Sequence, residues 1–578
     1  MRAQSRVLSR APLASALAVL LFAGAGCVGM QPNDDDPAQL GSIPAAGPSG
    51  GGATMEAQTS PSPEPPDGFD YVGTDQSARV RNPGQQPEHS EPQSLPADPS
   101  AIKVPTGYAV EVVAQGLDYP TDITFGPKGE IYVAEAGGHT YGTAPPNAPE
   151  ARLLQIMPGG AHRVVYDKTV PLDVLRKVEF GQPVPAEGIV PPFTGVTFNP
   201  ADGLLYLASR QRYATLNPQT GEWRTIIDGL PSWGEFLNTK PVFDREGKMW
   251  FVQSSQGNSG TVETHWIKLV DIFNKPDAHE VPCEDITVTG VDYFVKDKLE
   301  QYFPGKDKIR AEVYAPLGVD TTAGQVLPGK FWCNGAVYRV NADGTGAERI
   351  AWGLRSVFGL GFSPSGRLIV TQNSANIMKP RPLYDDWETI LSIEPGRWYG
   401  WPDYYSGLPI TDERFRRPND PEWKGNPENH AFALTEGTRK RLLKGGQPPQ
   451  PLVRIQPHAA TQGFSFGRPE WGMDGENELL VAEWGAIIPY YKDPEAWPGF
   501  RVSRVNLQTG ETEPFLINKC GKPAWIKGCG AGLRRPITTA WGPDGALYVV
   551  DFGVVQFTPK GMNARPDTGV IWKVVRRP

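Results

Sequence analysis

The chain has 578 residues with 65 Gly and 59 Pro, and so many turn-forming residues exclude a mainly helical protein. A formal net charge of -8 argues against nucleic-acid binding, which needs a concentrated basic surface. The hydrophobic content of 39%, with 16 Trp, 19 Tyr and 23 Phe, suits a large core, so we expect an all-β fold with many loops.

The first 26 residues have the pattern of an export signal. Three arginines precede an apolar stretch at 13–23, which is too short to span a bilayer comfortably, and small residues lead to Cys27. The segment resembles a bacterial lipoprotein signal. This resemblance implies that Cys27 is lipidated and that the exported chain is held by lipid alone, on the periplasmic or the cell-surface side. An ordinary cleaved signal with an incidental cysteine is the alternative.

Residues 27–103 are rich in Pro, Gly, Ser, Asp and Gln and show no apolar periodicity. This composition predicts a disordered tether between the membrane anchor and a folded domain at 104–578. No segment after the signal is predicted to span a membrane.

One hairpin pattern occurs six times in the folded domain. Each copy has an apolar strand ending in an aromatic residue, a tight turn with Gly, and a second apolar strand ending in a polar residue. A single hairpin cannot bury both of its faces, so the repetition predicts a six-bladed β-propeller. The copies lie at 122–135, 195–209, 240–253, 359–372, 463–483 and 538–551.

The two ends of the domain carry alternating strands that suit ring closure. Tyr108–Ala114 and Thr568–Val575 are predicted to share one blade. Two long insertions, at about 274–332 and 405–451, are expected to lie over one face as loops or small helical pieces.

Four cysteines follow Cys27, an even number that suits disulfides in an oxidising compartment. The most local of the three possible pairings joins Cys283 to Cys333 and Cys520 to Cys529.

Propeller geometry predicts a polar ring on one face, because residues just after each second strand and just before each first strand share one rim. Such a concave polar cluster is a candidate ligand site. Polar side chains also line the axis of any propeller because the axis holds water, so both interpretations stay open. The second strands end at Glu135, Ser209, Gln253, Gln372, Glu483 and Asp551, and the loops before the first strands add Arg355, His458, Arg534 and Arg535.

Four segments and one short motif stand out along the domain. The segments are 107–137, 353–373, 385–405 and 533–551, and the motif is Tyr-Gly-Trp-Pro at 399–402. They resemble the soluble quinoprotein glucose/sorbosone dehydrogenases, in order over nearly all of 104–577, and the motif is the most specific part. The resemblance implies a six-bladed propeller that binds pyrroloquinoline quinone and calcium, oxidises an aldose sugar and passes electrons to an acceptor.

The resemblance also assigns residues to the cofactor. Arg355, Arg534, Arg535 and Gln372 are expected to bind the quinone, because guanidinium groups pair well with carboxylates. The calcium-binding stretch of the family reads Asn373-Ser374-Ala375 in this chain.

Two family residues are replaced in this chain. The window before the second blade, 191–194, has no His where the family places its general base, and Trp484 stands at the position of a quinone-binding Lys. A base must reach the proton that it removes, so His139 and His458 on the rim are the candidate bases. For each of them, a histidine with a purely structural role is the alternative.

We carry three hypotheses from the sequence. The first is a quinone-dependent sugar dehydrogenase that uses these cofactor residues and bases. The second is a non-catalytic surface propeller that binds glycan or protein through its enlarged loops, where the aromatic side chains of 398–405 either stack on sugars or pack between blades. The third is a calcium-dependent lactonase-like hydrolase, with Glu135, Glu483 and Asp551 as metal ligands.

Overall fold

The computed structural model describes residues 96–138, 149–296, 299–416, 430–486, 496–558 and 561–577. All of them belong to one compact unit, Thr74–Pro578. Cys27, the export signal and most of the tether lie outside the described residues, so their assignments stay predictions. Within the described part of the chain, no helix has the length and apolarity needed to cross a membrane.

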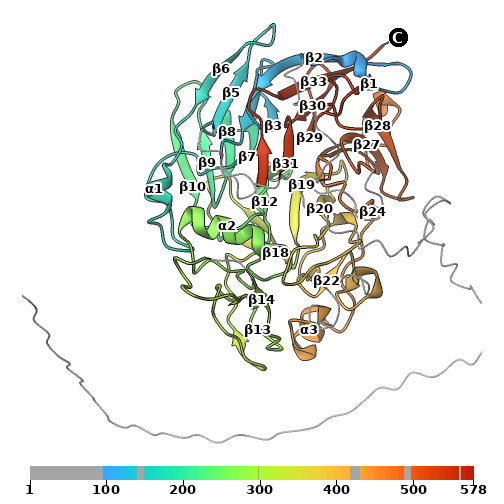
Figure 1. Cartoon of the computed structure of the whole chain (residues 1–578). Helices are drawn as coiled ribbons and strands as arrows, with labels where there is room; N and C mark the ends of the chain where they lie inside the picture. Colours follow the sequence, from blue (N-terminus) through green and yellow to red (C-terminus); the bar gives the residue numbers. More distant parts are fainter. Residues whose placement is uncertain are drawn as a thin grey trace, which may run out of the picture. The chain divides into compact units, whose positions relative to one another are not determined.

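Six antiparallel sheets form the blades of a β-propeller, which confirms the predicted fold (Figure 1). Blades 1 to 3 each have four strands, which follow one another in the chain from the axis outwards. Blade 1 contains β3 (Pro120–Phe125), β4 (Ile131–Glu135), β5 (Arg152–Ile156) and β6 (His162–Tyr166). Blade 2 contains β7 (Phe193–Asn199), β8 (Leu204–Ser209), β9 (Arg212–Leu216) and β10 (Trp223–Ile227). Blade 3 contains β11 (Val242–Phe243), β12 (Met249–Gln253), β17 (Ala336–Val340) and β18 (Glu348–Trp352).

The last three blades follow the same order, with strands from the N-terminal end added to two of them. Blade 4 contains β19 (Ser356–Phe362), β20 (Leu368–Asn373), β21 (Glu388–Ser392) and β24 (Val453–Ile455). Blade 5 contains β25 (Thr461–Phe466), β26 (Glu478–Glu483), β27 (Arg501–Asn506), β28 (Thr512–Asn518) and β1 (Ile102–Lys103). Blade 6 contains β29 (Pro536–Trp541), β30 (Leu547–Asp551), β33 (Gly569–Arg576) and β2 (Tyr108–Leu117).

The ring closes through the strands predicted for that role. β2 pairs antiparallel with β33, with Tyr108 opposite Arg576 and Val110 opposite Val574. Because β2 comes from the N-terminal end of the domain and β33 from its C-terminal end, blade 6 fastens the two ends of the chain together.

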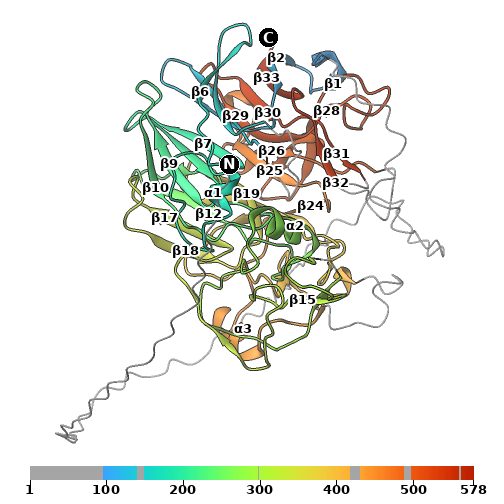
Figure 2. The same ribbon diagram turned by 60° about the vertical axis from the view of Figure 1, so that its left-hand side comes forward.

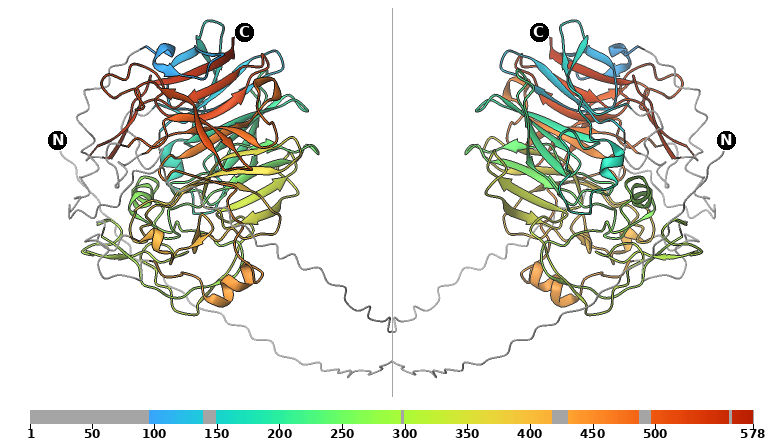
Figure 3. Two further views of the ribbon diagram at one scale, coloured as in Figure 1. Left: turned by 90° about the vertical axis from the view of Figure 1, so that its right-hand side faces the viewer. Right: turned by 90° about the vertical axis from the view of Figure 1, so that its left-hand side faces the viewer.

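Smaller elements lie outside the six blades, and those of the two insertions are grouped on the side of blades 3 and 4 (Figures 2 and 3). The α-helices are α1 (Leu172–Leu175), α2 (Thr264–Phe273) and α3 (Glu436–Leu442), and the 3-10 turns are η1 (Pro99–Ala101), η2 (Glu413–Phe415) and η4 (Pro469–Trp471). The two-stranded pairs are β13 (Ile286–Thr287) with β16 (Val326–Leu327), β14 (Phe294–Val295) with β15 (Ile309–Arg310), β22 (Tyr404–Tyr405) with β23 (Leu408–Pro409), and β31 (Val555–Thr558) with β32 (Gly561–Ala564).

The core follows from the period-2 pattern of the strands, which places apolar side chains between neighbouring blades. Leu153 and Phe193, for example, are fully buried in one cluster between blades 1 and 2. A second cluster packs α2 through Trp266 and Phe273 against Trp233. The blade 3 insertion therefore shares a hydrophobic core with the segment that connects blades 1 and 2, which contributes Val170 and Leu175.

Both predicted disulfides are present. Cys283 bonds Cys333 and Cys520 bonds Cys529, with Cα–Cα distances of 5.0 and 5.2 Å. The first closes most of the blade 3 insertion and the second closes a short loop after β28.

Candidate functional site

The predicted ring lies on one face of the propeller, where each second strand ends beside the start of its first strand. Glu135 pairs with Pro120, and Glu483 pairs with Thr461. The six side chains at these ends are mostly buried: Gln372 is half-buried, and the others are at most 3% exposed. Their polar atoms must therefore be satisfied by nearby groups.

The carboxylates of blades 1 and 5 are bonded within their own blades. Glu135 accepts hydrogen bonds from the backbone N–H of Asp118 at 2.7 Å and from Nε of Arg152 at 2.8 Å. Burial raises the pKa of Glu135 to about 7. Glu483 accepts from Nε of Arg501 at 2.9 Å. Each carboxylate thus holds the start of the next strand outwards, β5 or β27.

Asp551 has a comparable role in blade 6. Its carboxylate accepts hydrogen bonds from the backbone N–H groups of Arg534 and Arg535, both at 2.7 Å, and from Nε1 of Trp572 at 3.1 Å. The three carboxylates that were candidate metal ligands are therefore each engaged locally. No three Asp, Glu, His or Cys side chains in the described ranges are placed to hold a metal ion together.

Arg355 stands at the expected rim position because of a tight local turn. Gly353 links β18 to β19 with φ of +79°, and a Cβ there would lie 2.2 Å from the ring of Trp398. The backbone N–H of Arg355 then donates to Oε1 of Gln372 at 2.7 Å. Gln372 thus fixes the backbone of Arg355, and the two predicted cofactor residues are brought together.

The guanidinium of Arg355 points inwards and is saturated by the protein. Nε donates to the carbonyl of Asn258 at 3.0 Å and Nη2 donates to Oδ1 of the same residue at 2.7 Å. Nη1 donates to the carbonyls of Asn373 at 3.1 Å and Ser374 at 2.8 Å. The group also lies 4.5 Å from the ring centroid of Phe236, and the residue is 1% exposed.

Four buried carboxyl groups surround this cation, and each interacts electrostatically with it. Asp386 and Glu388 come from the blade 4 side, while Glu263 and Glu280 come from the blade 3 insertion. Burial raises the pKa of Asp386 to about 6, that of Glu280 to about 8, and those of Glu263 and Glu388 above the ordinary value. The four carboxyl groups outnumber the single guanidinium. Raised pKa values favour their protonated, neutral forms, which limits the negative charge of the cluster.

Arg535 is equally enclosed. Its Nη1 donates to the carbonyls of Trp484 and Gly485 at 3.2 and 3.0 Å, and Nη2 donates to that of Val555 at 3.1 Å. The guanidinium lies 3.9 Å from the Trp484 ring centroid. Its neighbour Arg534 is 6% exposed, and burial lowers its pKa. Trp484, at the family's Lys position, therefore packs on an internal arginine.

Blade 2 contains a third buried arginine that the sequence analysis did not select. Arg210 follows β8, and its guanidinium donates to the carbonyls of Pro191, Ser232 and Gly234 at 2.8 to 3.1 Å. It lies 4.9 Å from the ring centroid of Phe273, and burial lowers its pKa to about 9. A buried guanidinium that binds loop carbonyls thus recurs in blades 2, 4 and 6, which points to a structural device.

Neither candidate base is seen as a solvent-exposed histidine among the described residues. His139 lies outside them. His458 is 6% exposed, lies near Asp385 and Arg355, and has its pKa lowered to about 4 by burial. Its backbone N–H donates to Oγ of Ser374 at 3.4 Å. His458 is therefore neutral at pH 7 and packed inside the rim; a role as base stays a prediction.

The axis itself is narrow at the level of the first strands. A cavity of about 10 Å³ there is lined by residues from several blades, including Asp122, Thr194, Lys240 and Thr538. Nζ of Lys240 lies 3.1 Å from Oδ1 of Asp122. A cavity of this volume holds about one water molecule, so this part of the axis is a filled polar core.

The aromatic side chains of the Tyr-Gly-Trp-Pro segment pack between elements. Trp398, Trp401 and Tyr405 are only 2–3% exposed. Nε1 of Trp401 donates to the carbonyl of Asn258 at 3.3 Å. The packing interpretation is therefore correct for these three side chains, and they offer no stacking face to a sugar.

Calcium does not fit the position that the family resemblance assigns to it. The carbonyls of Asn373 and Ser374 both accept hydrogen bonds from Nη1 of Arg355. A calcium ion needs several oxygen ligands directed at one point, and these two oxygens already face a cation. The guanidinium would have to leave before the ion could bind.

The quinone does not fit the described residues either. It carries three carboxylates, and two of the arginines expected to bind them, Arg355 and Arg535, already donate to backbone carbonyls. We therefore derive no chemical step through the quinone.

No protein-family model matches the chain, and no curated protein matches it in sequence. Several solved structures resemble it. The holo pyranose dehydrogenase PQQ domain of Coprinopsis cinerea is 14% identical, with 86% of this chain and 98% of that chain covered and a TM-score of 0.47. The PQQ-bound aldose sugar dehydrogenase of Streptomyces coelicolor is 16% identical, with 82% and 99% covered and a TM-score of 0.41.

The soluble aldose sugar dehydrogenase of Escherichia coli, in its apo form, is 16% identical, with 81% of this chain and 100% of that chain covered and a TM-score of 0.42. These three proteins are sugar dehydrogenases, the class of protein that the sequence segments also resemble. At such identities and scores the likeness assigns no activity to this chain.

Proposed function

We propose that this chain is an exported propeller that binds a sugar or glycan and works without pyrroloquinoline quinone or calcium. One observation carries the proposal: the guanidinium of Arg355 is bonded to the carbonyls of Asn373 and Ser374, where the resemblance expects calcium. The scaffold of a sugar dehydrogenase is thus combined with an internally satisfied cofactor position.

The electrostatics of the rim also support the proposal. Glu263, Glu280 and Asp386 are buried beside Arg355 and have raised pKa values. An anionic cofactor would have to displace the existing contacts of Arg355, whereas a neutral sugar bound elsewhere leaves those contacts intact. The sugar ligand and the exported location come from the sequence resemblance and stay part of the proposal.

Binding and catalysis are to be measured on the same purified protein. Calorimetric titration with neutral and acidic oligosaccharides measures binding, and an artificial electron acceptor measures oxidation of aldoses after incubation with quinone and calcium. We expect saccharide binding without acceptor reduction. Acceptor reduction that needs both cofactors would contradict the proposal, and so would binding of no saccharide.

A further inference from the structure

A second polar site lies away from the propeller axis, in the insertions of blades 3 and 4. A cavity of about 780 Å³ opens between β13, β16 and α3, within the range of small-molecule sites. Its lining is polar, with Val326 and Phe331 as exposed apolar side chains at 59% and 45% exposure. It contrasts with the axial cavity, which holds about one water molecule.

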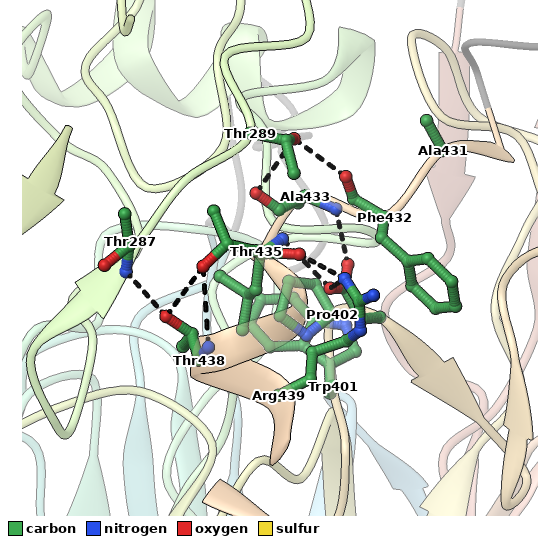
Figure 4. Close-up of polar contacts among 12 residues, drawn as sticks. Thr287, Thr289, Trp401, Pro402, Ala431, Phe432, Ala433, Thr435, Thr438 and Arg439 are labelled. Atoms are coloured by element: carbon green, nitrogen blue, oxygen red, sulfur yellow. Dashed lines mark hydrogen bonds and ion pairs between the residues drawn. The ribbon is translucent and has the colours of Figure 1, made fainter. Parts of the chain in front are cut away.

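The walls of the cavity are fixed by hydrogen bonds between distant segments. The backbone N–H of Thr435 donates to the carbonyl of Thr287 at 2.9 Å. The backbone N–H of Thr287 donates to Oγ1 of Thr438 at 3.1 Å, as Figure 4 shows. The backbone N–H of Gly329 donates to Oδ1 of Asp285 at 2.9 Å. These bonds join α3 to the β13–β16 pair and give the cavity a defined shape.

A buried carboxylate holds the chain that leads into α3. Asp403 accepts hydrogen bonds from the backbone N–H groups of Ala433 and Leu434 at 2.7 and 2.9 Å. It also lies 3.5 Å from Nη2 of Arg381 and 3.7 Å from Nη1 of Arg439. Because Asp403 follows the Tyr-Gly-Trp-Pro segment, blade 4 fixes the position of one cavity wall.

The charges that line the cavity are unequally matched. Arg349 forms an ion pair with Glu284, which neutralises both. Lys330 and Arg441 are exposed, and neither has an ion pair with a carboxylate among the described residues; Nη2 of Arg441 donates to the carbonyl of Asp285. The carboxylate of Asp285 also lines the cavity, so the lining carries three cations and two carboxylates, a net charge of +1, with Lys330 and Arg441 exposed to a ligand anion.

We propose that this cavity binds an acidic saccharide, in which Lys330 and Arg441 hold a carboxylate of a uronate unit. The Thr287 side chain lines the cavity and supplies a hydroxyl partner for a sugar hydroxyl group, and Phe331 supplies an apolar face for a sugar ring. The inference rests on the proposed function and adds the location of the site and the class of sugar.

The experiment titrates the full chain with trigalacturonate and with galactotriose, its neutral counterpart, by calorimetry. We expect trigalacturonate to bind at least tenfold more tightly, because hydrogen bonds to charged groups are stronger than those between neutral groups. Lys330→Met should remove most of this preference. Rising salt should weaken only the acidic ligand.

Two further variants keep the result interpretable. Arg441→Met tests the second cation but also removes a wall contact, so Lys330→Met carries the decision. Lys440→Met, on α3 at a side chain that is 73% exposed and paired with Glu436, is the matched control and should change neither affinity.

The outcomes separate this inference from the proposed function. Equal affinity for the two saccharides, or a preference that survives Lys330→Met, overturns the acidic-sugar site and leaves sugar binding intact. Binding of neither saccharide overturns both. Displacement of trigalacturonate by phosphate at constant ionic strength shows that the cavity takes any small anion, which also overturns the inference.

Discussion

The rim of the propeller and the cavity of the insertions both contain arginines beside carboxyl groups, yet the two regions differ in what the charges face. At the rim, Arg355 and Arg535 are at most 1% exposed and donate to backbone carbonyls. At the cavity, Lys330 and Arg441 are exposed and have no carboxylate partner among the described residues. The first arrangement stabilises a fold, and the second leaves charge available for a ligand.

This difference shows why residue type at a rim position is a weak guide to cofactor binding. A guanidinium that satisfies loop carbonyls and one that awaits an anion have the same sequence signature. Their contacts and their exposure separate them, and on both measures the insertion cavity is the better ligand site.

Replacement of Arg355 should give the largest effect. Arg355→Met removes the cation that faces Asp386, whose pKa of about 6 leaves it mostly ionised at pH 7, and an uncompensated buried charge costs about 3–5 kcal/mol. Urea unfolding at pH 7 measures the loss. A variant as stable as the parent would show that Arg355 is not a structural group and would favour a role in cofactor binding.

The two disulfides should contribute differently to stability, because they close loops of different length. In the chain-entropy model, loss of Cys283–Cys333, separated by 50 residues, costs about 4 kcal/mol, and loss of Cys520–Cys529, separated by 9, costs about 2.5 kcal/mol. Paired Cys→Ala variants and thermal unfolding test the order. Only the first loss should weaken saccharide binding, because Cys283 lines the cavity; the reverse pattern would contradict the placement of the site.

Glu280→Gln should change the pH dependence of stability. The folded state keeps the Glu280 proton up to about pH 8, whereas the unfolded chain loses it near the ordinary pKa of 4.5. The free energy of unfolding therefore falls as pH rises between these values. Because glutamine does not titrate, the variant should lose this contribution to the slope of the unfolding free energy against pH, which is at most about 1.4 kcal/mol per pH unit.

Urea unfolding between pH 5 and 8 measures that slope. Glu513→Gln is the control, since the Glu513 side chain is 69% exposed. An unchanged slope in Glu280→Gln would show that the buried carboxyl does not keep its proton in the folded state.

The smallest effect is expected at the cap of α3. Oγ1 of Thr435 accepts a hydrogen bond from the backbone N–H of Thr438, and loss of such a cap costs about 1 kcal/mol. Thr435→Ala should therefore lower the free energy of unfolding slightly and weaken saccharide binding. Thr435→Ser keeps the hydroxyl and should restore both. If the alanine variant binds as well as the parent, this wall is not part of the site.

The architecture could be predicted from the sequence because each blade is encoded locally. The period-2 strands, their Gly turns and the two terminal strands specify six sheets and their closure. The disulfide pairs were also predicted, as the most local choice. Most of these features depend on residues that are near one another in sequence or repeat regularly.

The state of the site could not be predicted in the same way. The position of Arg355 was predicted, but its partner Asn258 lies 97 residues away in an irregular segment. Glu263 and Glu280 lie in the same insertion without any repeat to mark them. The cavity is formed by three segments that have no common pattern, so only the folded chain brings Lys330 near α3.

Calorimetric titration of the intact protein with pyrroloquinoline quinone, in the presence and absence of calcium, tests the central claim most directly. If the Arg355 guanidinium holds the Asn373 and Ser374 carbonyls, neither addition gives binding heat, and chelation of calcium leaves the thermal midpoint unchanged. Stoichiometric quinone binding that requires calcium would contradict the account, because that complex cannot form while Arg355 keeps its present contacts.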